Sequence, residues 1–392
     1  PDTATKINGK KFKEQSWLGN VIGGIENATL TDWICELVQN AFDQDAKNCE
    51  LLINKVEGEL KFRHNGLPIR GPESGRYIGD VVALMEVGIS LKSFDLKSEG
   101  RYGVGFKYWK HHFEEASLSS GGLTMSWDKD WKTTAPSRIK KSDWTEFNFC
   151  RHIQSSPLEL DTSSLERLRN AIRMRPSNFE MKVRTIDSDG KQSFSWKHEM
   201  TQETDFNGID LLSFKDEYDD LEQVLETTLM RIKMNSPVFS SDISEEIRVC
   251  FTNAIEELQE QRMKLEGNIP IKVQRAVDDY FSDSFLVLGV FHEEDAKGEL
   301  LSLFPISAEG KSESRISFDA PFDIKPDRLN LKEDKEDGKP KRNRVLIKML
   351  LTSYGNLLKA IQSLPDFLPE DLIDHLLNHP PGCGETSDLD IK

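Results

Sequence analysis

Residues 36–43 read ELVQNAFD and form the centre of the segment that decides the fold. Around this stretch, Trp33, Leu37 and Ala41 recur at four-residue spacing, which is the apolar stripe of a packed helix. The pattern predicts a helix from about Thr31 to Lys47. One side of that helix should pack on a sheet.

The same helix carries a row of polar side chains. Glu36, Asn40 and Asp43 fall at i, i+4 and i+7, so they share one face. Glu36 and Asn40 are one turn apart, about 6 Å at ~1.5 Å rise per residue. An amide oxygen can ligate magnesium, and a neighbouring carboxylate can take a proton from an attacking water. A solvated polar face would show the same row, so the row alone does not decide the function.

Outward along the chain, residues 100–107 read GRYGVGFK. Gly100, Gly103 and Gly105 precede a predicted helix, whose free N–H groups favour phosphate, and Lys107 adds a positive charge. The order of the glycines differs from the dinucleotide G-x-G-x-x-G, and the P-loop and protein-kinase motifs do not occur. The loop is also compatible with a purely structural turn.

Two further elements complete a possible nucleotide pocket. The segment FRHNGLPI ends a strand at His64 and turns the chain at Asn65 and Gly66, where a base could pack against backbone. Thr145 lies in the predicted strand WTEFNFC, where a threonine hydroxyl can hydrogen-bond a base edge or satisfy itself locally.

The order and spacing of these elements resembles the GHKL ATPases (gyrase, heat-shock chaperone, histidine kinase and MutL), with a pattern closest to the MORC-like and sacsin-like branches. The resemblance implies Mg²⁺ and ATP as cofactors, Glu36 as the general base and Asn40 as the magnesium ligand. It also implies an ATP lid over about residues 88–100. The nucleotide-binding residues implied by the resemblance are Asn40, Asp43, His64, Asn65, Gly66, Gly88, Lys92, Gly100, Gly103, Val104, Gly105, Phe106, Lys107 and Thr145.

His64 departs from the family pattern, which has aspartate there to accept a hydrogen bond from the adenine amino group. Neutral histidine has one acceptor and one donor nitrogen, so the choice between adenine and guanine stays open. A second domain in the family sends a basic residue to the γ-phosphate. Lys325, Arg328 and Lys332 are the candidates here, and Arg328 is assigned with Glu36 and Lys107 to catalysis.

The composition limits the kinds of partner and the compartment that are expected for the chain. The 392-residue chain has a net charge of −16, which disfavours broad nucleic-acid binding without excluding a local basic patch. The cysteines are scattered and odd in number, which favours a reducing cytoplasm over a disulfide framework or zinc site. No apolar run is long enough for a membrane span, and the N-terminus has no secretory h-region.

The predicted fold is α+β: an α/β sandwich with a mixed, mostly antiparallel sheet, followed by a second, transducer-like α/β domain and a helical segment. The predicted units are an arm over 1–27, the ATP-binding domain over 28–152, the second domain over 153–335, the helical segment over 343–378 and a tail over 379–392. Within the second domain, the pattern predicts helices at about 163–174, 216–235 and 244–263, and strands at about 179–187, 284–292 and 298–305.

The sequence thus predicts slow, Mg²⁺-dependent ATP hydrolysis that closes the lid and switches conformation or oligomeric state. The expected partners are a nucleotide and either a protein partner or a second copy of the chain, and the resemblance favours a prokaryotic defence or stress role. A nucleotide-gated scaffold that does not hydrolyse ATP is the alternative. Phosphotransfer of the histidine-kinase kind is weaker because no dimerising helical hairpin precedes the pocket.

Overall fold

The structure is a computed structural model, and the statements below concern the residues that it describes. These residues are 30–69, 109–130, 132, 134, 137–153, 158–160, 162–266, 284–302, 304–305, 314–322, 341–364 and 367–381. The predicted arm and lid lie outside them, as do the glycine loop and the candidate basic residues of the second half. The predicted site residues outside the described part are Gly88, Lys92, Gly100, Gly103, Val104, Gly105, Phe106, Lys107 and Arg328.

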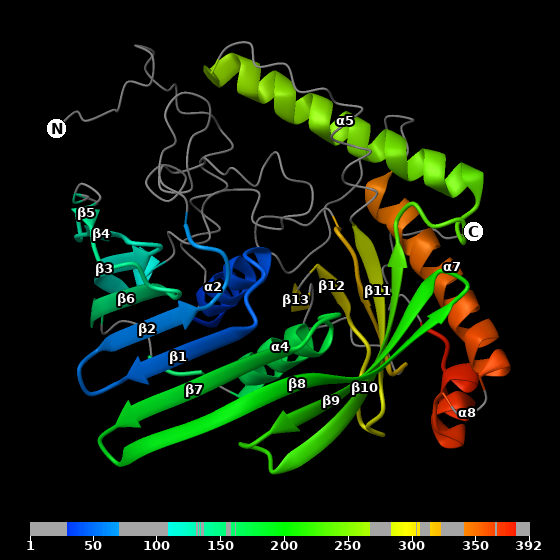
Figure 1. Ribbon diagram of the computed structural model, residues 1–392, viewed down its shortest axis with the longest axis horizontal. Helices are drawn as coiled ribbons and strands as arrows, with labels where there is room; N and C mark the ends of the chain where they lie inside the picture. Colours follow the sequence, from blue (N-terminus) through cyan, green and yellow to red (C-terminus); the bar gives the residue numbers. More distant parts are fainter. Residues whose placement is uncertain are drawn as a thin grey trace.

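One continuous sheet runs through the described part, with 14 strands in the order β13-β12-β14-β11-β10-β9-β8-β7-β1-β2-β6-β3-β4-β5 (Figure 1). The strands are β1 (Asn48–Asn54), β2 (Glu59–His64), β3 (Phe113–Ser120), β4 (Leu123–Trp127), β5 (Ser137–Arg138), β6 (Thr145–His152), β7 (Phe179–Asp187), β8 (Gly190–Phe206), β9 (Ile209–Tyr218), β10 (Gln223–Lys233), β11 (Phe285–Phe291), β12 (Leu300–Ser302), β13 (Phe304–Pro305) and β14 (Ile316–Asp319). The pairs β1–β7 and β12–β14 are parallel, and the other pairs are antiparallel.

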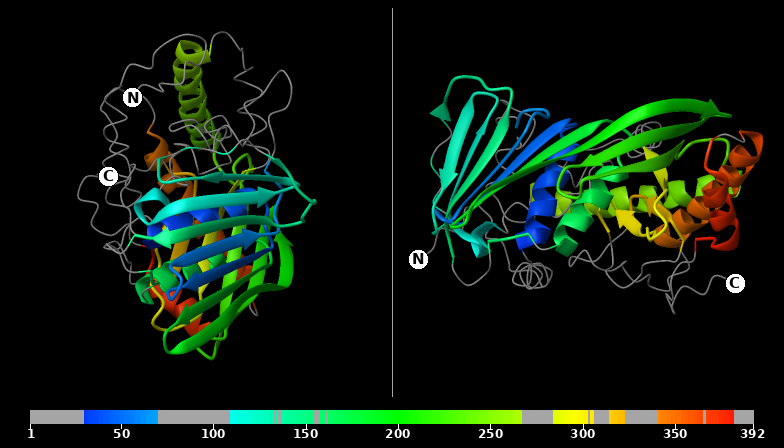
Figure 2. Two further views of the ribbon diagram at one scale, coloured as in Figure 1. Left: turned by 90° about the vertical axis from the view of Figure 1, so that its left-hand side faces the viewer. Right: turned by 90° about the horizontal axis from the view of Figure 1, so that it is seen from below.

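Helices line one face of this sheet, as the side view in Figure 2 shows for α2, α4 and α7. The described helices are α2 (Leu30–Asp43), α4 (Thr162–Arg173), α5 (Ser241–Glu266), α7 (Arg342–Ser363) and α8 (Glu370–Asn378). Burial alternates along β1 and β2 because successive strand residues point to opposite faces and only one face meets the helices. The prediction of an α+β fold with a mixed, mostly antiparallel sheet covered by helices is therefore confirmed. No helix of the described part is long and apolar enough to cross a membrane.

The first core is built where α2 meets the sheet. Trp33 packs edge-to-face on Phe149 of β6, with ring centroids 4.5 Å apart and planes at 87°. At the other end of the helix, Phe42 packs edge-to-face on Phe179 of β7 at 5.0 Å. The same cluster includes Leu168 of α4. Side chains on both sides of the predicted boundary at residue 152 thus share one core, and the domain boundaries stay a prediction.

A second core lies under the other half of the sheet. It joins β10 and β11 to the helices α5, α7 and α8, and its members include Phe251, Leu288, Leu346 and Leu372. The helix α7 coincides with the first part of the helical segment predicted over 343–378, and its apolar face packs within this core.

One predicted element is wrong. Residues 216–235, predicted as a helix, form the end of β9, a turn and β10. β10 lies between β9 and β11, and its two faces belong to different apolar clusters: Met230 lies in the second core, whereas Leu229 packs in a separate cluster with Met174 and Val287. A strand buried on both faces loses the two-residue alternation, and its apolar run then resembles part of a helix.

Candidate functional site

The site helix α2 is clamped at both ends, by Trp33 against β6 and by Phe42 against β7. Glu36 and Asn40 lie between these two anchors. The Glu36 side chain is only 4% exposed, whereas Asn40 and Asp43 are half-buried. A glutamate is rarely buried to this degree unless its charge has a specific use or partner, so a solvated polar face is excluded for Glu36.

His64 and Thr145 lie beside each other on the neighbouring strands β2 and β6. They are register partners at the end of β2 and the start of β6, and both are buried. The Thr145 hydroxyl lies 2.6 Å from the Ser120 hydroxyl, which in turn accepts the Ile69 N–H at 2.8 Å. The two residues that sequence reasoning placed near the base therefore do lie together, 81 positions apart in the chain. Ser120 is a neighbour that the sequence did not reveal.

The turn after β2 joins the sheet to the end of α2. The Asn65 Oδ1 accepts the backbone N–H groups of Lys47 and Asn48 at 2.9 and 2.8 Å. A Cβ on Gly66 would lie 2.5 Å from the Gln44 carbonyl oxygen, so this glycine is required for the close approach of two backbone segments. Asn65 and Gly66 thus hold the loop geometry, whatever contact they also make with a base.

Few side chains of the described part are placed to ligate a magnesium ion. Among its residues, no group of three or more His, Cys, Asp or Glu side chains is placed to hold a metal ion. Magnesium on a nucleotide keeps phosphate and water ligands and needs few from the protein, so the Asn40 amide oxygen beside the Glu36 carboxylate suffices. Asn40 and Glu36 fit a nucleotide-borne magnesium, and within the described residues no side-chain cluster fits a metal ion by itself.

A buried cation lies beside the C-terminal end of α2. The Arg175 guanidinium stands 3.9 Å from the centre of the Phe42 ring. Burial lowers the pKa of Arg175 to about 10, and the carboxylates of Asp45 and Asp43 oppose that shift. A positive charge at this position complements the negative end of the helix dipole and the neighbouring carboxylates.

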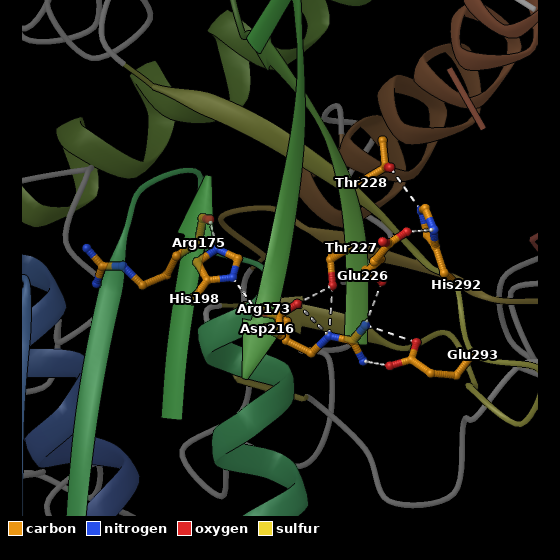
Figure 3. Close-up of polar contacts among 9 residues, drawn as sticks. All are labelled: Arg173, Arg175, His198, Asp216, Glu226, Thr227, Thr228, His292 and Glu293. Atoms are coloured by element: carbon orange, nitrogen blue, oxygen red, sulfur yellow. Dashed lines mark hydrogen bonds and ion pairs between the residues drawn. The ribbon is translucent and has the colours of Figure 1, made fainter. Parts of the chain in front are cut away.

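Sequence reasoning missed a buried polar network in the second half of the chain (Figure 3). His198 Nδ1 lies 2.6 Å from Asp216 Oδ1, and its Nε2 lies 2.7 Å from the Arg175 carbonyl oxygen. The other Asp216 oxygen accepts the Thr227 hydroxyl at 2.7 Å and lies 3.3 Å from Arg173 Nε. His198 and Asp216 are both 0% exposed, so their polar atoms find their partners inside the protein.

Arg173 extends this network toward β11. Its guanidinium forms an ion pair with Glu293 at 2.7 Å and lies 4.1 Å from the centre of the Phe291 ring. Burial lowers the pKa of Arg173, but the carboxylates of Asp216 and Glu293 outweigh burial, and the net shift is upward. These residues are far apart in the sequence and form no short motif. The sequence held no signal for the network, since His198 lies outside the predicted elements and Asp216 lies in the segment that was predicted as a helix.

Similarity to known proteins is found among solved structures. A scan of the sequence against protein families found no match, and a comparison with curated proteins found none either. Among solved structures, the chain is similar to the ATPase region of Saccharomyces cerevisiae topoisomerase II bound to ICRF-187 (dexrazoxane), with 16% identity and a TM-score of 0.32. That similarity covers 48% of this chain and 59% of the topoisomerase chain.

The N-terminal domain of a DNA repair protein is also similar, with 10% identity and a TM-score of 0.33 over 69% of this chain and 96% of that one. The chain's own sheet and helices show an α+β fold with a mixed, mostly antiparallel sheet. These similarities carry no argument about function, which rests on the residues of this chain.

Proposed function

We propose that this chain binds Mg²⁺–ATP between α2 and the sheet and hydrolyses it slowly. The observation that carries the proposal is the burial of Glu36, one helical turn from Asn40, on a helix fixed at both ends. A buried carboxylate beside a magnesium-compatible amide is the arrangement that hydrolysis requires. The pairing of His64 with Thr145 at the neighbouring sheet edge supports a base pocket next to it.

In this proposal Glu36 accepts a proton from the water that attacks the γ-phosphorus. The bond from the γ-phosphorus to the ADP oxygen breaks, and the products are ADP and phosphate. Asn40 ligates the magnesium that accompanies the phosphates, and Asp43 lies one turn further along the helix. From outside the described residues, Gly103, Gly105 and Lys107 would hold the phosphates, as the family resemblance implies.

Closure of the lid over about residues 88–100, with Gly88 and Lys92, is part of the same proposal, as is charge stabilisation by Arg328. The cycle would change the affinity for a protein partner or for a second copy of the chain. The resemblance alone places it in a prokaryotic defence or stress response in the cytoplasm. A scaffold that binds ATP without hydrolysis is the second candidate, because His64 departs from the family pattern.

The test compares the full-length wild type with Glu36→Gln and, as a matched control, Glu217→Gln at a half-buried position of β9. Thermal unfolding is followed with Mg²⁺ and ATP or ADP, and phosphate release is measured in the same samples. ATP at ~100 times its dissociation constant should stabilise all three proteins by about 2.7 kcal/mol. Glu36→Gln should lose roughly 10²–10⁴-fold in turnover, because it removes the general base, while Glu217→Gln keeps wild-type turnover.

Other outcomes separate the alternatives. Stabilisation without phosphate release by the wild type would favour the scaffold. An equal loss of binding and turnover in Glu36→Gln would remove Glu36 from the role of base. Absence of stabilisation by any nucleotide would refute the site as a whole.

A further inference from the structure

The strand β5 and the three residues that follow it form an exposed basic segment at one end of the sheet. This segment, residues 137–141, reads SRIKK, and each of its residues is exposed. β5 is the last strand in the order of the sheet, and among the described residues it pairs only with β4 (Figure 1). The outer side of β5 is therefore an open sheet edge in the described part of the chain.

The backbone of β5 directs polar groups away from the sheet at this edge. Arg138 lies opposite Leu123 of β4, and the next residue, Ile139, donates its N–H to the Gly122 carbonyl oxygen at 2.8 Å. Neighbouring residues of a strand direct their N–H and C=O groups to opposite sides, so those of Arg138 point away from β4. No described strand lies on that side. One donor and one acceptor are thus accessible to an incoming chain.

The side chains of the segment are positive, although the chain as a whole has a net charge of −16. Arg138, Lys140 and Lys141 form no ion pair with the residues that the structure describes. Other exposed lysines of the sheet do, such as Lys215, which pairs with Glu217 at 3.0 Å. The segment therefore presents positive charge that a carboxylate of the chain does not neutralise by direct contact.

Two further residues define the chemistry of this edge. Ile139 lies between the basic residues and is 42% exposed, which adds an apolar contact. Asp143 is also exposed, and with three basic residues and this one acid, residues 137–143 keep a net charge of +2. The edge thus combines open backbone groups, positive charge and one apolar side chain.

We propose that this edge binds an acidic, extended segment of a protein partner, which adds to the sheet as a strand beside β5. The partner's backbone pairs with the outward N–H and C=O groups of Arg138, and its carboxylates lie against Lys140 and Lys141. The same charges repel a second copy of this edge, so they select an acidic strand over self-association. A nucleic acid would use the cations but cannot supply the alternating donors and acceptors of a strand.

The test measures binding of a fluorescein-labelled peptide of alternating Glu and Val, about eight residues long, to the full chain by fluorescence anisotropy. The wild type should bind it, and less tightly as salt rises from about 0.1 M to 1 M, because the Debye length falls from ~10 to ~3 Å. Lys140→Glu/Lys141→Glu should weaken binding roughly tenfold. Lys191→Glu/Lys233→Glu, the same change of charge at exposed positions of β8 and β10, should bind like the wild type.

A matched pair of variants tests whether the peptide adds as a strand. Arg138→Ala and Arg138→Pro both remove the positive charge, but only proline also removes the outward N–H. The pairing with β4 does not use that N–H, so the two variants should have similar melting temperatures. Arg138→Pro should bind the peptide about threefold more weakly than Arg138→Ala, since one hydrogen bond is lost. Equal affinities of the two variants would overturn the addition of a strand.

Three other outcomes would also overturn the proposal. They are a wild type that does not bind the acidic peptide, equal binding by Lys140→Glu/Lys141→Glu, and tighter binding of a single-stranded oligothymidylate than of the peptide. The last outcome would identify the edge as a nucleic-acid contact instead. None of these measurements contains a nucleotide triphosphate, so their failure leaves the proposed ATP site unaffected.

Discussion

Arg173→Met removes a guanidinium that binds several oxygens at once. Its Nε donates to the Thr227 hydroxyl at 2.8 Å, and its Nη2 donates to the Glu226 carbonyl oxygen at 3.1 Å and to Glu293 at 2.9 Å. The Arg173 side chain is 5% exposed, and Asp216 beside it is 0% exposed. Methionine can fill much of the apolar volume but leaves these carboxylates without their cation.

The expected loss follows from the burial of the partners. Removing one member of a buried ion pair typically costs 3–5 kcal/mol, because the other charge stays buried without compensation. For 392 residues, an unfolding entropy of roughly 2.1 cal/mol/K per residue amounts to about 0.8 kcal/mol/K. The melting temperature should therefore fall by roughly 4–6 °C for a cooperative transition.

Differential scanning calorimetry of Arg173→Met and a matched control measures this loss. The control is Arg184→Met on β7, where the arginine is exposed and the expected change is within about 0.5 kcal/mol. The double variant Arg173→Met/Asp216→Asn should lose less than the sum of its single changes, since it removes both buried charges. A melting temperature of Arg173→Met within about 1 °C of that of Arg184→Met would refute the reasoning.

Two more predictions concern the turn and the pH dependence. Gly66→Ala should destabilise by about 1–3 kcal/mol, because its Cβ would lie 2.5 Å from the Gln44 carbonyl oxygen, whereas Gly355→Ala in α7 meets nothing within 4 Å and should stabilise. Equal melting temperatures of these two variants would contradict the prediction. Burial lowers the pKa of His292 below its ordinary 6.5, so the unfolded state binds a proton there first and the free energy of unfolding falls as pH drops below 6.5. His292→Gln should reduce that slope in urea titrations between pH 5 and 7.5 (roughly one unit or more on either side of 6.5), and an unchanged slope would count against it.

Local periodicity was enough to predict the site helix, since Trp33, Leu37 and Ala41 are all buried on one stripe of α2. It failed for β10, where Thr227 and Thr228 are both buried although they point to opposite faces. Their environment depends on β9 and β11, which flank β10 in the sheet. No local pattern contains that information.

The candidate site, too, was predictable from the sequence only in part. The spacing of Glu36 and Asn40 placed both on one helix, but it could not show that Glu36 is buried. The resemblance predicted that His64 and Thr145 belong to one base pocket, but no local signal showed that they are paired between β2 and β6. The role of Gly66 as a point of backbone contact depends on where the turn after α2 lies, and only the folded chain shows this.

The buried charges of the second half have a physical reason in the end of α4. The chain leaves α4 inside the protein beside β8 and β9, and the carbonyl group of Arg175, two residues past the helix, needs a hydrogen-bond donor there. His198 supplies the missing donor to the Arg175 carbonyl oxygen, and both of its ring nitrogens then face oxygen atoms. Asp216 Oδ1 lies against the other ring nitrogen of His198, and Arg173 forms an ion pair with Asp216 Oδ2.

Each polar side chain of this network therefore pairs with a polar group that would otherwise be buried without a partner. The same helix end contacts the site helix, because Arg175 packs on Phe42 of α2 and on Phe179 of β7. On its other side, Arg173 packs on Phe291 of β11. An apolar replacement of the network would leave the Arg175 carbonyl unsatisfied between the two cores, so polar residues are required at this point even though each one costs desolvation.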